Sequence, residues 1–422
     1  MLNYFYTEHH YVLFLLVVAL LLLIVFYVVE ELYHKYTLRK IPFRIHVNGT
    51  RGKSSVARLI AAGLRAGNIK TSCKTTGTLA RFIDPEGNEM PVFRVGFTNV
   101  IEQVSIIRKA RKLNTEALVI ECMALQPLLQ SICELKIVRA THGVLTNARP
   151  DHLDVMGPED SDVALALAAT VPVRGKFFTP EKIQLPIFQM AVKDRKSELC
   201  HIDEKDINEI TDADIKGFSY AEFKENVALA LKVCASLGVE KEIALKGMWQ
   251  AKPDPGAMTK HEFRVNESKL LFANGFAAND PVSTEMLWDK LIKEHHDVDE
   301  KILILNCRND RQDRTLQFVD VIPKWQMPSA IILIGTGTET FTKAYRKKNH
   351  STKILDLEGL TSEEIVVKIA KEFQLKNLLL VGIGNIYGIG LELIDYVQEK
   401  AHEKIISTDQ DPLKQKIKIK DK

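Results

Sequence analysis

The sequence predicts an α/β protein with parallel sheets, preceded by a single transmembrane helix. Three observations lead to this prediction: a long apolar run near the N-terminus, short apolar segments that alternate with amphipathic stretches from about residue 41 onward, and a glycine-rich loop between a short strand and a helix. Alternation of strand and helix with short connections is typical of parallel α/β folds. The length of 422 residues is sufficient for two or three domains.

The composition excludes several classes of protein. Apolar residues make up 46% and charged residues 26% of the chain, which excludes a mainly disordered protein. The net charge of +3 arises from 57 basic and 54 acidic residues. This balance provides no bulk attraction to a phosphate backbone, so we expect no nucleic-acid partner. The 6 cysteines include no C-x-x-C pair, so neither a zinc cluster nor a disulfide framework is indicated.

The apolar run Tyr11–Val29 contains 19 residues and predicts a membrane anchor. At about 1.5 Å per residue, it matches the hydrocarbon layer of about 30 Å. A secretory signal peptide has a basic front and a small-residue cleavage site, and this run has neither. Basic residues follow the run at Lys35, Arg39, Lys40 and Arg44, and none precedes it. The positive-inside rule therefore predicts a single-pass membrane protein, with the N-terminus outside and the rest in the cytoplasm.

The remainder of the chain divides at a turn with two prolines and a glycine, Lys252–Gly256. We expect an anchor in residues 1–40, a nucleotide-binding domain in 41–257, a smaller α/β domain in 258–405 and a basic tail in 406–422. The expected strands are Arg44–Val47, Ala117–Glu121, Val138–Leu145, Ile302–Asn306, Ala330–Ile334 and Leu378–Val381. The expected helices between them are Lys53–Ala66, Val100–Lys112, Asn226–Leu237 and Leu360–Phe373.

The most informative motif is a phosphate-binding loop. A β-branched strand leads into the residues Gly49, Thr50, Arg51, Gly52, Lys53, Ser54 and Ser55, and a helical pattern follows. Glycines let several backbone N–H groups face one point, and the helix N-terminus adds partial positive charge. Lys53 would reach the outer phosphates, and the Ser54 hydroxyl would bind Mg²⁺. The first glycine of the common G-x-x-x-x-G-K-[ST] pattern is replaced by Val47, and the alternative is a chance glycine turn.

Further polar residues follow other expected strands of the same domain. Glu121 ends one strand, the segment Asp151–Asp154 with His152 follows another, and Thr75–Thr78 follows a third, Lys70–Lys74. Ligands of parallel sheets gather at the carboxyl ends of strands, so a carboxylate there could hold Mg²⁺ and His152 could ligate a second metal or contact a phosphate. The alternatives are a helix-capping glutamate, a surface loop with capping aspartates and a plain turn.

Two motifs stand out in the second domain. The segment Asn306–Arg314 contains three arginines and two aspartates in its last seven residues. Such a loop suits carboxylate or phosphate binding, and a solvated salt-bridge loop is an equally good interpretation. The glycines of Gly382–Gly390 are similar to a dinucleotide fingerprint, but no βαβ unit follows them, so a substrate-binding turn is the better interpretation.

Together these motifs resemble the Mur ligase superfamily, the ATP-dependent amide ligases of peptidoglycan and folylpolyglutamate synthesis. Within it the sequence is most similar to the catalytic subunits of poly-γ-glutamate synthases of the PgsB/CapB type. The stretches that carry this resemblance are NGTRGKSSVARL, KTTGT, ECMALQP, DHLDVMGP, PDPGAM, NGFAANDPVST, NCRNDRQDRT and GIGNIYG, spread over residues 48–388. The resemblance implies a P-loop Mur-ligase-like central ATPase domain and a Rossmann-like C-terminal ligase domain.

The resemblance also implies an activity: polymerisation of glutamate from γ-carboxyl to α-amine through an acyl phosphate, with ATP and Mg²⁺ as cofactors and Mn²⁺ as the alternative metal. The residues implied as catalytic are Lys53, Glu121 and His152. Those implied for nucleotide binding are the loop residues 49–55 with Asn226 and Arg308. Those implied for the metal are Ser54, Glu121 and His152. Those implied for the substrate are Thr76, Thr78, Asp280, Asp310 and Arg311.

The partners implied are glutamate or the growing polymer and a multi-span membrane subunit, with oligomers possible. The sequence departs from the wider Mur pattern in three ways. The stretch after His152 offers no lysine for carbamylation, Ala257 replaces the arginine of a P-G-R signature, and no separate UDP-binding domain fits between the anchor and the phosphate loop. Two alternatives are a membrane-tethered P-loop ATPase that regulates an envelope complex, and a Mur or folylpolyglutamate-type ligase with another acceptor.

Overall fold

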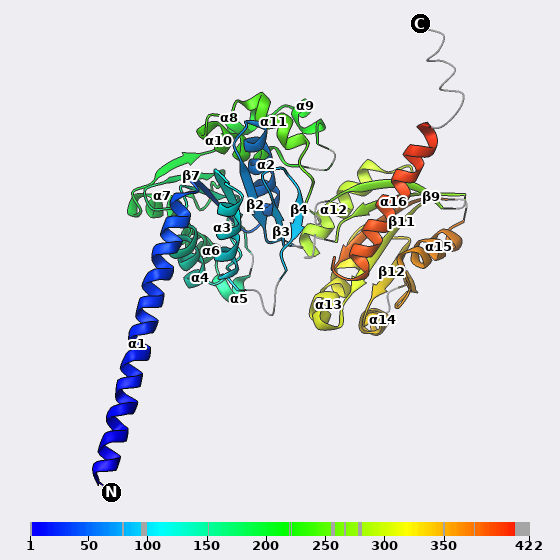
Figure 1. Ribbon diagram of the computed structural model, residues 1–422. Helices are drawn as coiled ribbons and strands as arrows, with labels where there is room; N and C mark the ends of the chain where they lie inside the picture. The colour runs from blue at the N-terminus through cyan, green and yellow to red at the C-terminus, as the bar shows by residue number, and fades with distance from the viewer. Residues whose placement is uncertain are drawn as a thin grey trace. The chain divides into compact units, whose positions relative to one another are not determined.

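The computed structural model describes residues 2–409, except for 78–79, 94–98, 151, 219, 221, 255–257, 266, 277–280, 349–350 and 375. The chain forms two compact units. Unit 1 comprises Met1–Phe218 and Glu222–Lys252, and unit 2 comprises Ser219–Ala221 and Pro253–Lys422. Both are α/β, as the sequence predicts, and each contains a mainly parallel sheet (Figure 1).

Unit 1 begins with α1, Leu2–Arg39, a single helix of 38 residues. Among the residues that the structure describes, its segment Tyr11–Arg39 is the one candidate long and apolar enough to cross a membrane, and none of its apolar window is buried. The helix continues for ten residues beyond the expected span, since it ends at Arg39 and the apolar run ends at Val29. This extension packs against α3 (Glu102–Lys112) of the same unit.

The sheet of unit 1 has the order β4-β3-β2-β5-β1-β6-β7-β8. The six strands from β2 to β8 in this order are parallel, and β3 and β4 add an antiparallel edge. The strands are β1 Phe43–Asn48, β2 Thr71–Thr75, β3 Arg81–Ile83, β4 Glu89–Pro91, β5 Ala117–Glu121, β6 His142–Leu145, β7 Lys176–Thr179 and β8 Glu198–His201. The central position of β1 places the loop that follows it between the ends of β5 and β6.

Helices cover both faces of this sheet. α2 (Lys53–Ala66) packs against α10 (Lys224–Ser236) and α11 (Lys241–Trp249), whereas α3 contacts α1 and the π-helix η1 (Cys133–Val138). The other helices are α4 Pro127–Ile132, α5 Leu153–Met156, α6 Asp160–Ala168, α7 Leu185–Asp194, α8 Glu204–Asn208 and α9 Asp212–Lys216. The result is a three-layer domain whose parallel strands end at one edge.

The expected strand Val138–Leu145 is wrong in its first half. The structure has η1 up to Val138, a left-handed residue at Arg139 with φ 48°, and β6 only from His142. Ile137 and Val138 are buried in a helix-lined core instead. A short apolar run is compatible with a buried helix as well as with a strand, so the pattern alone could not separate them.

Unit 2 has a six-stranded sheet of order β13-β12-β11-β14-β10-β9, antiparallel only at β9. Its strands are β9 Lys260–Val265, β10 Ser268–Asn274, β11 Glu300–Cys307, β12 Ala330–Gly335, β13 Lys353–Asp356 and β14 Asn377–Gly384. Its helices are α12 Pro281–Glu294, η2 Asn309–Arg311, α13 Gln312–Val321, η3 Ile322–Lys324, α14 Thr338–Lys347, α15 Ser362–Glu372 and α16 Ile389–Asp409. Two apolar clusters, one on each face, form its core.

Candidate nucleotide-binding site

The loop between β1 and α2 has the backbone geometry of a phosphate cradle. Gly49 has φ 133° and Gly52 has φ 81°, and both values lie where a side chain causes strain. A Cβ at Gly49 would also lie 2.1 Å from Thr146 Oγ1. Gly52 is the N-cap of α2, which begins at Lys53. The glycines therefore turn the backbone so that the N-terminus of a 14-residue helix faces the concave side of the loop.

Lys53 lies over this loop. Its Nζ atom donates to Gly49 O at 2.7 Å and to Thr50 O at 3.3 Å. The two carbonyls hold the ammonium group beside the backbone that would surround a phosphate. Ser54 and Ser55 follow in the first turn of α2, where both are partly buried.

The loop after β6 holds the phosphate loop in place through Asn147, a residue that the sequence analysis did not single out. Its Oδ1 accepts hydrogen bonds from Thr50 Oγ1 at 2.6 Å and from Arg51 N at 3.1 Å. Its Nδ2 donates to Arg51 O at 3.0 Å, and Thr146 Oγ1 donates to the same oxygen at 2.6 Å. In the sequence, Thr146 and Asn147 are visible only as two polar residues after an expected strand. Their contact with the phosphate loop follows only once β6 is known to pair with β1.

Glu121 lies at the carboxyl end of β5 and is almost fully buried. Its Oε2 accepts a hydrogen bond from Ser54 Oγ at 2.8 Å and another from Thr76 N at 2.7 Å. Its backbone oxygen accepts from Gln103 Nε2 at 3.1 Å. The structure thus brings together three of the residues singled out in the sequence: Ser54, Glu121 and Thr76.

The hydroxyl of Ser54 and the carboxylate of Glu121 form an all-oxygen donor pair at the opening of the phosphate loop. Hard divalent cations such as Mg²⁺ and Mn²⁺ prefer such oxygen donors, and Mg²⁺ commonly takes only one or two carboxylates and completes its shell with phosphate and water. Among the described residues no group of three His, Cys, Asp or Glu side chains could hold a metal by itself. The residues present therefore fit a cation that arrives with a nucleotide.

His152 occupies a different environment from Glu121. It is the N-cap of the short helix α5, it has φ 48°, and its side chain is exposed. It follows the end of β6, on the same edge of the sheet as the phosphate loop. Its neighbour Asp151 lies outside the described residues. The metal or phosphate role of His152 remains a prediction.

Asn226 lies beside the phosphate loop. It is the third residue of α10, and its Oδ1 is 3.2 Å from the position that a Cβ would take at Gly52. Its Nδ2 donates to Glu222 Oε1 at 2.8 Å. The contact places this side chain at the start of α2, and its nucleotide role remains a prediction. The predicted substrate residues Thr78 and Asp280 lie outside the described residues.

The arginine-rich loop of unit 2 follows β11. Arg308 forms two hydrogen bonds with Asp310, of 2.9 and 2.6 Å, and its guanidinium lies 5.6 Å from the ring centroid of Tyr387. The Arg308 guanidinium holds the pKa of the Asp310 carboxyl below its usual range. Arg311 is exposed in η2. Arg308 also lines a cavity of about 420 Å³ at the carboxyl ends of the strands. The pair with Asp310 fits a solvated salt-bridge loop, and the cavity fits a loop that binds a carboxylate or phosphate.

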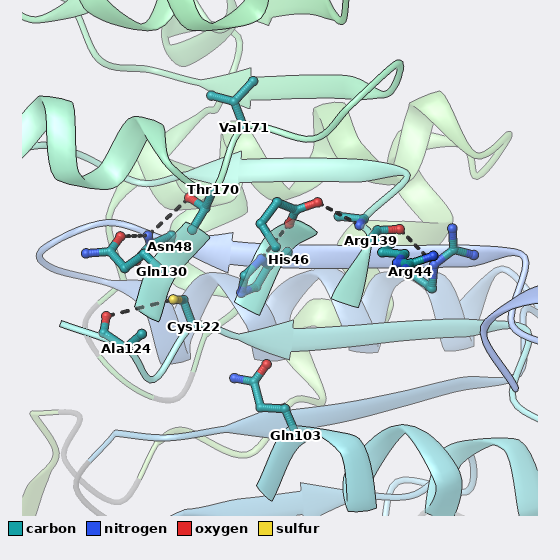
Figure 2. Close-up of polar contacts among 12 residues, drawn as sticks. Arg44, His46, Asn48, Gln103, Cys122, Ala124, Gln130, Arg139, Thr170 and Val171 are labelled. Carbon is teal, nitrogen blue, oxygen red and sulfur yellow. Dashed lines mark hydrogen bonds and ion pairs between the residues drawn. The ribbon is translucent and has the colours of Figure 1, made fainter. Parts of the chain in front are cut away.

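A row of polar side chains along β1 was not predicted. Arg44, His46 and Asn48 alternate along the strand and face the same side of the sheet (Figure 2). Asn48 Nδ2 donates to Gln130 Oε1 at 2.8 Å. Arg44 Nε donates to the backbone oxygen of Arg139 at 2.9 Å. The row begins just after the C-terminal end of α1, where Arg44 Nη1 donates to Ile41 O at 2.7 Å. It ends at Asn48, the residue before the phosphate loop.

Fold and site together define a P-loop α/β protein with a buried carboxylate beside the phosphate cradle. Residues 47–166 match the Mur ligase middle domain, and residues 260–400 match the poly-γ-glutamate synthase CapB C-terminal domain. The crystal structure of a bifunctional folylpolyglutamate synthase/dihydrofolate synthase with Mn, AMPPNP and L-glutamate bound has the same fold. Its TM-score is 0.58 at 12% identity, over 87% of this chain and 92% of that one.

Two curated relatives are much closer in sequence. The capsule biosynthesis protein CapB of Bacillus anthracis is 39% identical over 375 residues, which cover 88% of this chain and 80% of that protein. The PGA synthase CapB of Bacillus subtilis (strain 168) is 36% identical over 385 residues, which cover 90% and 96%. The chain belongs to the CapB family of poly-γ-glutamate synthases, a branch of the Mur ligases. The family and the fold class predicted from the sequence are both confirmed.

Proposed function

We propose that this protein is a membrane-anchored, ATP-dependent amide ligase that joins glutamate units from γ-carboxyl to α-amine. The observation that carries this proposal is the hydrogen bond between Ser54 and Glu121 at the opening of the phosphate loop, in a chain of the CapB family. A P-loop alone serves many chemistries. The names of the relatives, a capsule biosynthesis protein and a PGA synthase, support ligation over simple ATP hydrolysis.

The reaction has two steps whose atoms balance. An oxygen of the glutamate γ-carboxylate attacks the γ-phosphorus of ATP, the bond to the β–γ bridging oxygen breaks, and ADP leaves. The α-amine of a second glutamate then attacks the acyl carbon, loses a proton, and expels phosphate that contains one former carboxylate oxygen. Phosphoryl transfer of this kind depends on placement and charge neutralisation.

Each residue of the site has a proposed task in this sequence. The backbone N–H groups of residues 49–55 and the Lys53 ammonium would neutralise the β- and γ-phosphates. Ser54 and Glu121 would hold the divalent cation, Mg²⁺ or Mn²⁺, whose charge lowers the cost of bringing two anions together. Thr76 would orient Glu121 through its backbone N–H. His152 would contact a second cation or the γ-phosphate, and Asn226 would contact the nucleoside.

The roles proposed for unit 2 and for the domains follow the family. Arg308 would contact nucleotide, and Asp310 and Arg311 would contact the amino substrate, together with Thr78 and Asp280. The nucleotide-binding domain would comprise residues 41–257 and the ligase domain residues 258–405. α1 would cross the bacterial membrane once with its N-terminus outside, because the basic residues all follow the apolar run. A multi-span subunit would complete the export path, and oligomers are compatible with this arrangement.

An isotope experiment tests the ligase proposal. The full-length protein in membranes is given ATP, Mg²⁺ and glutamate labelled with ¹⁸O in both carboxyl groups, and the released phosphate is analysed by mass spectrometry. Ligation through an acyl phosphate transfers one ¹⁸O to each phosphate, and ADP release requires glutamate. Release of ADP without glutamate, with unlabelled phosphate and no amide product, would show a P-loop ATPase instead. A requirement for a UDP-linked or folate-like acceptor would indicate another ligase of the superfamily.

A further inference from the structure

We propose that the amino edge of the sheet in unit 1 carries an accessory binding site for an acidic amino acid, supplied either as free glutamate or as the amine end of a γ-linked glutamate chain. The amino edge is the one where the parallel strands β6, β7 and β8 begin. The identity of the ligand rests on the proposed function, because that function supplies both glutamate and its polymer. The residues that line the site all belong to unit 1.

A cavity of about 480 Å³ opens at this edge. It lies at the first residues of three neighbouring strands and at the loops that lead into β7 and β8. The polar side chains that line it include His142, Arg174, Lys176, Lys196, Ser197 and Glu198. Sites for small molecules commonly have volumes of about 300–1,000 Å³. The cavity is therefore large enough for one amino acid or for the end of a short chain.

The cavity is distinct from the nucleotide site. His142 is the register partner of Ile45 in β1, and the phosphate loop begins after Asn48 at the other end of that strand. From Ile45 to Asn48 the strand advances about 10 Å at 3.3 Å per residue. β7 and β8 lie still further from β1 in the strand order. A ligand in the cavity therefore leaves Ser54 and Glu121, at the opposite edge, free for nucleotide and cation.

The charges of the cavity are complementary to those of glutamate. Arg174, Lys176 and Lys196 contribute three positive charges, and Glu198 contributes one negative charge. Among the described residues, none of the three basic side chains has an ion-pair or hydrogen-bond partner. Glutamate at neutral pH carries two carboxylates and one ammonium group. The basic side chains suit the carboxylates, and Glu198 suits the ammonium group.

The register of the strands places these groups in one row. His142 is the partner of Lys176, and Lys176 is the partner of Glu198. Register partners point to the same face of a sheet, so an imidazole, an ammonium group and a carboxylate follow one another across β6, β7 and β8. Lys176 and Glu198 are neighbours of opposite charge, yet no ion pair joins them. Both remain available to a ligand.

His142 is the buried member of this row. It is only 7% exposed, and its ring lies between Phe43 and Phe178, with centroid separations of 6.3 and 6.0 Å. Its Nδ1 is 2.8 Å from Thr141 Oγ1, and its Nε2 has no hydrogen-bond partner among the described residues. Burial is the main cause that lowers its pKa to about 4, so the ring is neutral at pH 7. Because buried polar atoms normally have partners, this nitrogen at the cavity wall indicates a place for a ligand atom.

The two loops that carry the basic residues hold each other in place. Arg174 N donates to Arg195 O at 3.0 Å, and Gly175 N donates to Ser197 Oγ at 3.2 Å. Arg174 and Lys196 have φ values of 55° and 54°, in the left-handed region that residues with a side chain rarely adopt. Such backbone persists where the surroundings fix it, often at ligand sites. The cavity wall is therefore formed before a ligand arrives, which lowers the entropy cost of binding.

Hydrogen exchange in the full-length protein, in detergent and without nucleotide, tests the site. The probes are glutamate, γ-linked triglutamate, glutarate, which lacks the amine, and inorganic phosphate. Exchange is followed in peptides that contain the amides of Gly175 and Glu198, and affinities are measured by equilibrium dialysis. The cavity variants are Lys176→Gln and Glu198→Gln. The matched control is Lys193→Gln, which removes the same charge from an exposed position of α7 outside the cavity.

We expect glutamate or triglutamate to slow exchange at these amides. Binding should be about tenfold weaker in Lys176→Gln and unchanged in Lys193→Gln. Protection by glutamate identifies the free amino acid as the ligand, and protection by triglutamate alone identifies the chain end. The wild-type protein should bind the probe with an amine more tightly than glutarate, and Glu198→Gln should remove this preference, because the ammonium group loses its charged partner.

Three results would overturn the inference: no protection by any probe, equal affinity of the wild-type protein for glutamate, glutarate and phosphate, or equal binding by Lys176→Gln and Lys193→Gln. The transfer of ¹⁸O to phosphate is measured separately. Normal ¹⁸O transfer without binding at the cavity would refute this site and leave the ligase proposal intact. Binding at the cavity without ¹⁸O transfer would refute the ligase and leave the site.

Discussion

His46 Nδ1 lies 2.8 Å from Glu134 Oε2, and both side chains are completely enclosed by unit 1. The second carboxylate oxygen accepts a hydrogen bond from Ala140 N at 2.8 Å. This pair joins the central strand β1 to the π-helix η1. Figure 2 shows His46 between Arg44 and Asn48 on β1. π-Helical turns are rare and are often found at functional sites. The pair is therefore a buried polar contact that attaches η1 to the middle of β1.

Stability at alkaline pH should depend on this pair. Burial lowers the pKa of His46, but its contacts with Cys122 and Glu134 outweigh that effect and raise the pKa from 6.5 to about 10. The stabilisation is complete below pH 6.5 and is lost as the pH rises through about 10. Glu134→Gln should cost about 3–5 kcal/mol at neutral pH, because one partner of a buried pair is removed. Hydrogen exchange of the β1 amides measures the opening free energy, and an unchanged value in Glu134→Gln would contradict this prediction.

Stability at acid pH should depend on His142. Burial lowers its pKa to about 4, with help from the nearby charges of Lys176 and Arg44. Since the unfolded chain binds the proton more tightly, the folded state loses stability as the pH falls from 6.5 toward 4. The total loss is roughly 3 kcal/mol, from about 1.4 kcal/mol per pKa unit. His142→Phe keeps the stacking on Phe178 and should remove this acid slope from the unfolding free energy of the protein, whereas a persistent slope would assign it to other groups.

Asn147 should be necessary for tight nucleotide binding. Asn147→Ala removes three hydrogen bonds to Thr50 and Arg51. At about 0.5–1.5 kcal/mol each, the three bonds contribute about 1.5–4.5 kcal/mol, so their loss should raise the Kd for a fluorescent ATP analogue by at least about tenfold. Asn88→Ala is the matched control, because Asn88 also donates through its amide but lies in an exposed turn, bonded to Asp84 at 3.1 Å. Equal affinities for the two variants would show that the phosphate loop holds its shape without the β6 loop.

Gly49 should tolerate no side chain. Gly49→Ala combines φ 133° with a Cβ that would lie 2.1 Å from Thr146 Oγ1, so the loop must move. We expect loss of ATP binding, measured by titration calorimetry, in a protein that remains folded. Gly238→Ala is the control: its φ of 83° causes backbone strain, but nothing lies within 4 Å of its Cβ position. Normal binding by Gly49→Ala would exclude the proposed cradle.

The cation dependence of turnover should identify the metal-binding side chains. Glu121→Gln and Ser54→Ala each remove one oxygen ligand or its charge from the loop opening. Both should raise the Mg²⁺ concentration needed for half-maximal ADP release by about 10–100-fold, and partial rescue by Mn²⁺ would fit a site of oxygen donors. Arg149→Ala, at an exposed position on the same edge, should leave the Mg²⁺ dependence unchanged. Wild-type Mg²⁺ dependence in Glu121→Gln would place the cation elsewhere.

Much of the fold could be predicted from local patterns. β5 was expected at Ala117–Glu121 and α2 at Lys53–Ala66, and the structure has the same bounds. Both are long or strongly apolar segments bounded by clear turn residues. The predicted strand was wrong at Val138, which lies in η1. There the only local signal was a short apolar run, which fits a buried helix as well as a strand. The predicted length of α1 was too short. Its last turns, which pack against α3, are amphipathic, so hydropathy did not identify them as part of the same helix.

The sequence by itself determined the phosphate loop, the membrane-spanning candidate and the family, because these depend on residues that are close together in the chain. Only the tertiary structure placed Asn147 under the loop, Glu121 against Ser54, and His46 against Glu134. The physical reason is that these contacts join segments 67–97 residues apart, brought together by the strand order β5-β1-β6. Local preferences specify each strand, but the pairing of the strands depends on how their faces are buried together in one sheet.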